Sequence, residues 1–469
     1  MLRLIYAVRM KTLRVLGLLL VASVVTGCGS GDQDAVADEA PIQGRAASGM
    51  PPAPGAVRAH VPTAASPYDV CGGIIPGSPA PTDAYRMRCE VIVPTESGWT
   101  AQHVAIGDVT GDGKPDVVGS AGYGGPVYVP EVVRVHVASF NGPGAPAVST
   151  LSFPGLPSSA HGMTLADLDG DGVDEIVVES AGQLTIAAHK NGQWSYRRLP
   201  SIQPARYLAP IDANSDGAMD VFAQSWSSGA HVYFADGKGG IDRHVRFDNG
   251  AAGYNTVRTA DVDGDGRPDV TVTNGQGWPK VWHYINRFGT NLDPAVEYDL
   301  RPTVSSPVRG IAVGDVDGDG LVDLVVSQAS QSGEPNGLRI FHGGLAHATS
   351  RSSFLRIEGQ YQLPAAIAIT DLDGDSRQDL VVGFDSEDSL AYFRQGPDGF
   401  AAPVRMRTDD SALTVGAFTH GSFRIADIDL NGCPDIALAH SATSLRVYFG
   451  ENCRTWEPVM GGPLPPLSL

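Results

Sequence analysis

Seven short clusters of acidic residues carry the most specific chemistry in this sequence. They follow one nine-residue pattern, acid-x-acid-x-acid-Gly-x-x-acid, and they begin at Asp108, Asp167, Asp212, Asp261, Asp315, Asp371 and Asp427. Carboxylates this close together repel one another and raise each other's pKa. A hard divalent cation removes that cost, and Ca2+ accepts six to eight oxygen ligands in a flexible geometry. The pattern therefore predicts up to seven bound Ca2+ ions.

Each position in the pattern has an expected role. Side chains at positions 1, 3 and 5 curl around the ion, position 6 makes a sharp turn, position 7 offers its carbonyl, and position 9 adds the last carboxylate. The predicted side-chain ligands are Asp108, Thr110, Asp112 and Asp116; Asp167, Asp169, Asp171 and Glu175; Asp212, Asn214, Asp216 and Asp220; Asp261, Asp263, Asp265 and Asp269; Asp315, Asp317, Asp319 and Asp323; Asp371, Asp373, Asp375 and Asp379; and Asp427, Asp429, Asn431 and Asp435.

The seven copies differ in negative charge, and this difference predicts their relative affinity for Ca2+. The second, fourth, fifth and sixth have four carboxylates, although the sixth has Ser376 where the turn favours glycine. Thr110, Asn214 and Asn431 each replace an acid, so the first, third and seventh sites are expected to bind Ca2+ most weakly. In the seventh, Cys433 stands at position 7 and would ligate through its carbonyl. Asp174 is expected to lie outside the ligand set, because Ile176 fixes Glu175 as position 9.

The residues around the loops indicate β-structure and exclude two familiar calcium motifs. An EF-hand needs Glu at position 12, whereas position 12 here is non-acidic in every copy and most copies have an aliphatic residue there. Dockerin-type loops fail for the same reason. Alternating apolar stretches such as 103–107 precede the loops, and β-branched runs such as 324–326 follow them. Each unit reads as strand, acidic loop, strand, turn, strand, turn, strand.

The repeat length predicts how these units assemble. The copies recur about every 50 residues, which is the size of one four-stranded propeller blade. Small sheets that bury their faces against one another and close into a ring leave few exposed edges. We therefore predict an all-β fold, a seven-bladed β-propeller of four-stranded antiparallel blades. Either 89–93 or 456–459 could supply the strand that completes the last blade, and an open β-solenoid is the alternative fold.

The stretch from Ala312 to Val326, AVGDVDGDGLVDLVV, resembles the FG-GAP/VCBS repeat. The resemblance extends over roughly residues 90–460 and implies an integrin-α-like propeller with calcium bound between the first two strands of a blade. The Phe-Gly pair that names the FG-GAP repeat is not evident before the first strand, so the copies look closer to the VCBS subset. This departure argues against transferring integrin function.

The N-terminal region resembles an export signal. Basic residues precede an apolar run, 15–25, that is too short for a comfortable membrane span. The run ends in Val-Thr-Gly-Cys, which resembles a bacterial lipobox and implies a lipidated Cys28. An ordinary secretory signal is the alternative. The predicted organisation is a signal peptide at 1–27, a flexible linker at 28–66 and a propeller at 67–469. We expect the chain to be lipid-anchored to the bacterial cell envelope, at the outer membrane, and otherwise to be secreted.

Cysteine count and charge narrow the function. Lipidation of Cys28 leaves four cysteines, for which we favour the pairs Cys71–Cys89 and Cys433–Cys453. A net charge of −19 argues against a nucleic-acid partner. We expect a monomeric, non-catalytic propeller that binds a glycan or protein ligand at the cell surface, with Trp194, Trp226, Trp278 and Trp282 as candidate contacts. The alternatives are a scaffold in an envelope assembly and a polysaccharide-acting enzyme.

Overall fold

The computed structural model describes residues 40–41 and most of 86–453. The gaps within the second range are 95–98, 124–131, 143, 157–159, 181, 201–204, 226–228, 248–255, 274–277, 302, 305, 307, 329–335, 344–350, 358–363, 385–389, 407–422, 441–443 and 452. Every regular element in the described residues is a strand. The predicted signal peptide, Cys28 and Cys71 lie outside the described residues, as does all of the predicted linker except Ala40 and Pro41.

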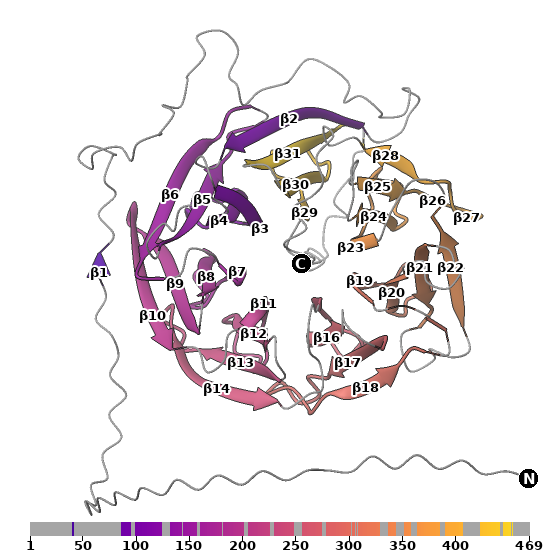
Figure 1. Ribbon diagram of the computed structural model, residues 1–469, viewed down its shortest axis with the longest axis horizontal. Coiled ribbons are helices and arrows are strands. Elements are labelled where there is room, and N and C mark those ends of the chain that lie inside the picture. Colours follow the sequence, from indigo (N-terminus) through magenta and orange to yellow (C-terminus); the bar gives the residue numbers. More distant parts are fainter. Residues whose placement is uncertain are drawn as a thin grey trace, which may run out of the picture. The chain divides into compact units, whose positions relative to one another are not determined.

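Seven four-stranded antiparallel sheets follow one another around a ring (Figure 1). The first four blades are β3 (Trp99–Gly107), β4 (Asp116–Tyr123), β5 (Val132–Ser139) and β6 (Ala147–Pro154); β7 (Gly162–Ala166), β8 (Glu175–Ser180), β9 (Gln183–Lys190) and β10 (Gln193–Pro200); β11 (Ala205–Ile211), β12 (Asp220–Ser225), β13 (Ala230–Ala235) and β14 (Ile241–Phe247); and β15 (Val257–Ala260), β16 (Asp269–Thr273), β17 (Lys280–Tyr284) and β18 (Val296–Asp299).

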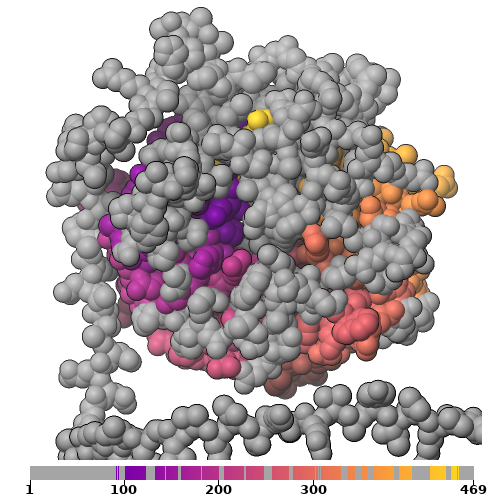
Figure 2. Space-filling view, in the orientation of Figure 1, coloured from indigo at the N-terminus to yellow at the C-terminus, as the bar shows by residue number. Residues whose placement is uncertain are grey.

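The last three blades complete the ring. They are β19 (Ile311–Gly314), β20 (Asp323–Gln328), β21 (Gly337–Phe341) and β22 (Ser352–Arg356); β23 (Pro364–Thr370), β24 (Asp379–Phe384), β25 (Leu390–Phe393) and β28 (Val404–Met406); and β29 (Phe423–Ala426), β30 (Asp435–His440), β31 (Ser444–Glu451) and β2 (Arg86–Pro94). A small hairpin, β26 (Gln395–Gly396) with β27 (Gly399–Phe400), extends the sixth blade, and β1 (Ala40–Pro41) pairs with β10. Figure 2 shows the blades in the same order from indigo to orange.

The ring closes through a strand from its N-terminal side. Strand β2 pairs antiparallel with β31, in a register that runs from Arg86 opposite Glu451 to Pro94 opposite Ser444. Segment 89–93 is therefore the closing strand, and the C-terminal alternative at 456–459 lies outside the described residues. A disulfide joins Cys433 to Cys453 and confirms one of the two predicted pairs.

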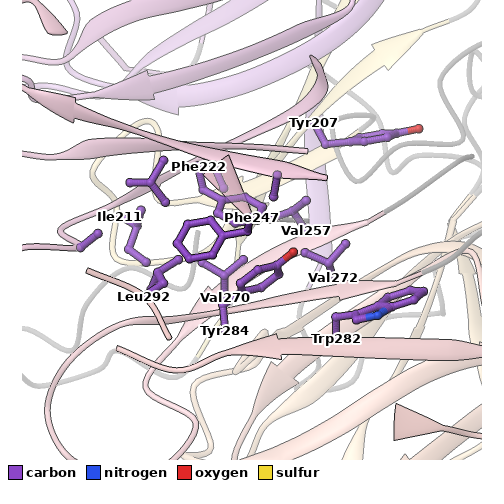
Figure 3. Close-up of a cluster of buried hydrophobic side chains, with 14 of the residues drawn as sticks. Tyr207, Ile211, Phe222, Phe247, Val257, Val270, Val272, Trp282, Tyr284 and Leu292 are labelled. Atoms are coloured by element: carbon purple, nitrogen blue, oxygen red, sulfur yellow. The ribbon is translucent and has the colours of Figure 1, made fainter. Parts of the chain in front are cut away.

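The hydrophobic core lies between successive blades. Between the third and fourth, Phe222 packs edge-on against Tyr284 with ring centroids 5.3 Å apart, and Phe247 contacts the same tyrosine at 5.5 Å (Figure 3). Val270 and Val272 of β16 add β-branched surface to this cluster. Each sheet buries both faces in such clusters, which is why a single blade could not fold alone. The predicted seven-bladed, all-β propeller is confirmed.

Candidate metal centres

All seven acidic loops connect the first and second strands of a blade, and position 9 is the first residue of the second strand in each. The position-9 residues are Asp116, Glu175, Asp220, Asp269, Asp323, Asp379 and Asp435, which begin β4, β8, β12, β16, β20, β24 and β30. The residue at position 2 is apolar in every loop, and six of the seven are fully buried: Val109, Leu168, Ala213, Val316, Leu372 and Ile428. Each loop is thus anchored to the core at both ends.

Position 1 organises the turn. In the fifth loop, Oδ1 of Asp315 accepts a hydrogen bond from the amide of Gly318 at 2.8 Å, and Oδ2 accepts one from Gly320 at 2.8 Å. The equivalent aspartates of the other loops also accept amides of positions 4 to 6. They are Asp108, Asp167, Asp212, Asp261, Asp371 and Asp427. These amides hold the position-1 carboxylate at the mouth of the turn.

The turn requires left-handed backbone at positions 4 and 6. Ser376, at position 6 of the sixth loop, has a φ of 69°, the strained conformation that its sequence position predicts. Position 4 has the same requirement, which sequence reasoning missed. Glycine fills it in five loops, but Ser215 has a φ of 57° and Leu430 has a φ of 60°. The third and seventh loops, which are short of an acid, are therefore also the ones strained at position 4.

Position 9 has a structural role that the sequence analysis did not predict. In the fourth blade, Oδ2 of Asp269 accepts the amide of Val262 at 2.9 Å, and Oδ1 accepts the amide of Asn286, just after β17, at 2.7 Å. Equivalent pairs of bonds involve Asp220, Asp323, Asp379 and Asp435. The carboxylate therefore ties the loop to the end of the third strand, while exposing no more than 2% of its surface in any blade.

Burial raises the pKa of every position-9 carboxyl group, because its charged form loses hydration. The pKa rises to about 6 for Asp269, to about 7 for Glu175, Asp220 and Asp379, and to about 8 for Asp435; it also rises for Asp116 and Asp323. Neighbouring loop carboxylates raise these pKa values further, whereas the backbone hydrogen bonds lower them.

These shifts predict how the metal-free protein responds to pH. A carboxyl group whose folded pKa exceeds its unfolded pKa stabilises the fold fully below about pH 4, and this contribution is lost as pH rises through the folded pKa. In chelator, we expect the melting temperature to fall between pH 5 and pH 8. Excess Ca2+ should remove that fall, because metal binding requires the charged form. Differential scanning calorimetry across this range checks both curves, and a metal-free curve that rises with pH would contradict the assignment.

The acids at position 3 have carboxylate oxygens that could accept a cation. Asp373 is 3% exposed, and its Oδ1 is buried with no hydrogen-bond donor among the described residues; Oδ1 of Asp169 in the second loop is in the same state. A buried carboxylate oxygen without a donor costs free energy that a metal ion would offset.

The fully charged loops bring their carboxylates together. Three oxygens lie within 4.8 Å of one another in each of the second, fourth, fifth and sixth loops: Asp167, Asp169 and Glu175; Asp261, Asp263 and Asp265; Asp315, Asp317 and Asp319; and Asp371, Asp373 and Asp379. These are the four loops with a full set of acids. These carboxylate groups suit a hard cation such as Ca2+, and in the fifth loop His342 also lies close enough to Asp317 and Asp323 to offer a ring nitrogen.

The remaining predicted residues make hydrogen bonds within their own loops. Nδ2 of Asn214 donates to Oδ2 of Asp216 at 2.8 Å, and Nδ2 of Asn431 donates to Oδ2 of Asp429 at 3.2 Å. The amide of Thr110 donates to Oδ2 of Asp116 at 3.1 Å. Position-5 acids accept the amide of position 7; they are Asp112, Asp171, Asp216, Asp265, Asp319 and Asp375. Asp263 is the remaining position-3 acid, in the fourth loop.

Basic side chains near the ends of the third strands enter three of the loops. Lys190 pairs with Asp169, Arg394 pairs with Asp373, and Nδ1 of His342 lies 2.9 Å from Oδ2 of Asp317. These side chains would have to move aside, or share the carboxylate, when a metal binds. In the sequence, each of these basic residues lies 15 to 19 positions after position 9 of its loop. The spacing alone does not reveal the contact, because only the folded hairpin brings the basic residue over the loop.

Asp174 connects two neighbouring loops. Its amide donates to the carbonyl of Asp108 at 2.8 Å, and burial together with the charges of Asp167 and Asp108 raises the pKa of its carboxyl group to about 7. It therefore adds an acid beside the first loop, which has Thr110 in place of one.

A cleft of about 590 Å3 lies between the acidic loops of the fifth and sixth blades. Asp315 and Asp317 line one side, and Ser376, Gln378 and Gln395 line the other. Of the tryptophans considered as ligand contacts, Trp282 is 2% exposed within a blade interface, Trp194 packs partly buried against another interface, and Trp278 is 65% exposed. Trp226 lies outside the described residues. Among the described residues, no helix has the length and hydrophobicity needed to cross a membrane.

Comparison with known proteins agrees with this architecture. The family described as the FG-GAP-like repeat matches residues 212–272 and 261–326, and the FG-GAP repeat matches residues 100–137. Human cartilage acidic protein 1 is 28% identical over 156 residues, which are 30% of this chain and 22% of that protein. This chain therefore covers less than a quarter of that relative's length.

Two solved structures are similar over most of this chain. Rhamnogalacturonan lyase YesW is 13% identical with a TM-score of 0.45, over 81% of this chain and 75% of the other. The WD40 domain of Toxoplasma gondii coronin is 10% identical with a TM-score of 0.48, over 81% and 90% of the two chains. Neither likeness bears on function. The repeat matches and the fold together define a seven-bladed β-propeller that contains FG-GAP repeats.

Proposed function

We propose that this chain is a calcium-stabilised recognition propeller that binds a glycan or protein ligand and performs no catalysis. The observation that carries the binding role is the cleft of about 590 Å3 between the fifth and sixth blades. Its volume falls in the range of ligand sites, roughly 300–1,000 Å3. Polar groups line it on both sides, and its wall includes the acidic loop of the fifth blade.

The calcium half of the proposal is supported by the buried, donor-free oxygens of Asp169 and Asp373 and by the clustered carboxylates of four loops. All seven loops are candidate sites, and the first, third and seventh are expected to be weakest. Metal at Asp315 and Asp317 would also fix one wall of the cleft. Ligand binding is therefore expected to weaken when Ca2+ is removed.

The location remains part of the proposal. The basic start, the short apolar run and the Cys28 motif support an exported chain, lipid-anchored to the bacterial cell envelope and otherwise secreted, with a signal peptide at 1–27, a linker at 28–66 and a monomeric propeller at 67–469. A scaffold in an envelope assembly is the second candidate function. It predicts a stoichiometric protein partner that does not compete for the cleft.

Blocking the cleft tests the recognition role. Gln378, at position 8 of the sixth loop, lines the cleft, so Gln378→Trp should fill it. Met219 occupies position 8 of the third loop and does not line the cleft, so Met219→Trp is the matched control. We expect a ligand identified on a glycan array or in a protein-binding screen to lose at least tenfold in affinity for Gln378→Trp alone. Equal ligand affinity of the two variants would show that the cleft is not the ligand-binding site.

A further inference from the structure

His342 places an imidazole ring beside the acidic loop of the fifth blade. It directly follows β21, and the next residue, Gly343, donates its amide to the position-9 carboxylate. The same amide contact identifies the equivalent residue in four other blades. In blade order from the third to the seventh, these residues are Phe234, Ile285, His342, Arg394 and Phe449. The fifth blade is therefore the one of these five that presents a nitrogen ligand to its loop.

The ring of His342 is oriented with Nδ1 toward the loop. Its Nε2 lies 2.9 Å from Oγ of Ser353, on the neighbouring strand β22 (Figure 1). A proton on Nε2 donated to this hydroxyl leaves the lone pair of Nδ1 free to face the acids. Nδ1 is buried and makes no hydrogen bond among the described residues, although Oδ2 of Asp317 is only 2.9 Å away.

Three side chains converge on one point beside this nitrogen. Asp317, Asp323 and His342 each offer a ligand atom, and the three atoms lie within 4.8 Å of one another. Two atoms bound about 2.1 Å from one metal ion, at angles between 90° and tetrahedral, are roughly 3.0–3.4 Å apart. The 2.9 Å between Nδ1 and the Asp317 oxygen is close to this separation, so little movement would be needed for both atoms to bind one ion.

Asp323 can bind a metal without giving up its structural contacts. It is fully buried, and its two oxygens accept the amides of Val316 at 2.9 Å and Gly343 at 2.7 Å. A carboxylate has about four lone-pair sites, so two remain. The two amides hold the carboxylate in place, as outer-shell groups hold the ligands of a metal.

We propose that Asp317, Asp323 and His342 form a binding site for a divalent first-row transition ion such as Zn2+. Imidazole nitrogen suits these ions, whereas Ca2+ takes oxygen ligands. Asp317 also belongs to the oxygen cluster with Asp315 and Asp319, so the two kinds of ion would compete for it. The site does not depend on Ca2+ binding by the other loops or on a ligand in the cleft, so each of these proposals can fail alone.

Isothermal titration of Zn2+ into the untagged full chain tests the proposal, with millimolar Ca2+ present to occupy the carboxylate loops. We expect His342→Phe to bind one equivalent of Zn2+ fewer than the wild type, because it removes the nitrogen ligand. Phenylalanine is the residue at this position in the third and seventh blades. The matched control is His244→Phe on β14, which removes an exposed histidine far from any predicted ligand in the sequence and should bind Zn2+ like the wild type.

A pair of serine variants on β22 provides a test that leaves the three ligands in place. Ser353→Ala frees the ring of His342 and should weaken Zn2+ binding about tenfold. Ser352→Ala, its equally exposed neighbour, should leave the affinity unchanged. If His342→Phe did not fold, this pair would decide. The proposal would be overturned by a wild type that binds no Zn2+, by equal stoichiometry in His342→Phe, or by equal affinities of the two serine variants. The Ca2+ proposal is tested separately, from melting temperatures measured without Zn2+.

Discussion

Chelation of calcium should lower the melting temperature of this propeller by roughly 10–15 °C. Each site saturated at a hundredfold excess over its Kd stabilises the fold by about 2.7 kcal/mol. The four fully charged loops together would contribute about 11 kcal/mol, and for a domain of this size 1 kcal/mol corresponds to roughly 1–1.5 °C. Calorimetry in millimolar Ca2+ and then in EGTA measures the difference directly.

The magnesium response is the control for this experiment. Mg2+ demands a nearly octahedral shell and gives up its water reluctantly, so it should restore only a small part of the loss. Metal analysis of the purified chain should find at least the four fully charged loops filled. A melting temperature that is the same in calcium and in chelator would rule out structural metal, although the fold would stand.

The second large effect separates the buried carboxylate at position 9 from the exposed carboxylate at position 5. Asp269→Ala should destabilise the protein by about 2–5 kcal/mol with or without calcium, because it leaves the buried amides of Val262 and Asn286 without acceptors. Asp265→Ala should matter only in calcium. Asp265 is exposed, and its side chain accepts the amide of Arg267 and pairs with the Arg267 guanidinium in its own loop, contacts that contribute little to stability at an exposed site.

Urea unfolding of Asp269→Ala and Asp265→Ala, each in calcium and in EGTA, gives the four free energies of unfolding that the comparison needs. Asp269→Asn provides an intermediate, since its single side-chain carbonyl can accept one of the two amides but carries no charge. We expect it to recover part of the stability in EGTA and little of the calcium response. If Asp269→Ala proved neutral in EGTA, position 9 would be a metal ligand only, and its contact with the third strand would be incidental.

The fold could be predicted because the acidic pattern marks two things at once. Its period gives the blade size, and its ninth residue marks the start of the second strand, as at Asp323 in β20. The closing strand could not be chosen, since 89–93 and 456–459 are both short apolar segments and only the pairing of β2 with β31 decides between them.

The place of each acidic loop in its blade was predictable from the sequence, but the surroundings of the loop were not. The contact of Gly343 with Asp323 and the approach of Lys190 to Asp169 depend on where the third strand returns, which is a tertiary property. The left-handed backbone at Leu430 was hidden because five other copies have glycine there, where the same conformation causes no strain. The cleft arises only when the fifth and sixth blades meet.

The pairing of β2 with β31 has a consequence for how the protein folds. A segment near residue 90 must wait, unpaired, until a segment near residue 447 has been made, because the seventh sheet lacks its outer strand until then. Such a long-range contact is slow to form. During synthesis, the waiting strand presents an open edge that a chaperone or a second copy of the chain could occupy. Domain-swapped pairs are thus the misassembly to look for when this protein is refolded at high concentration.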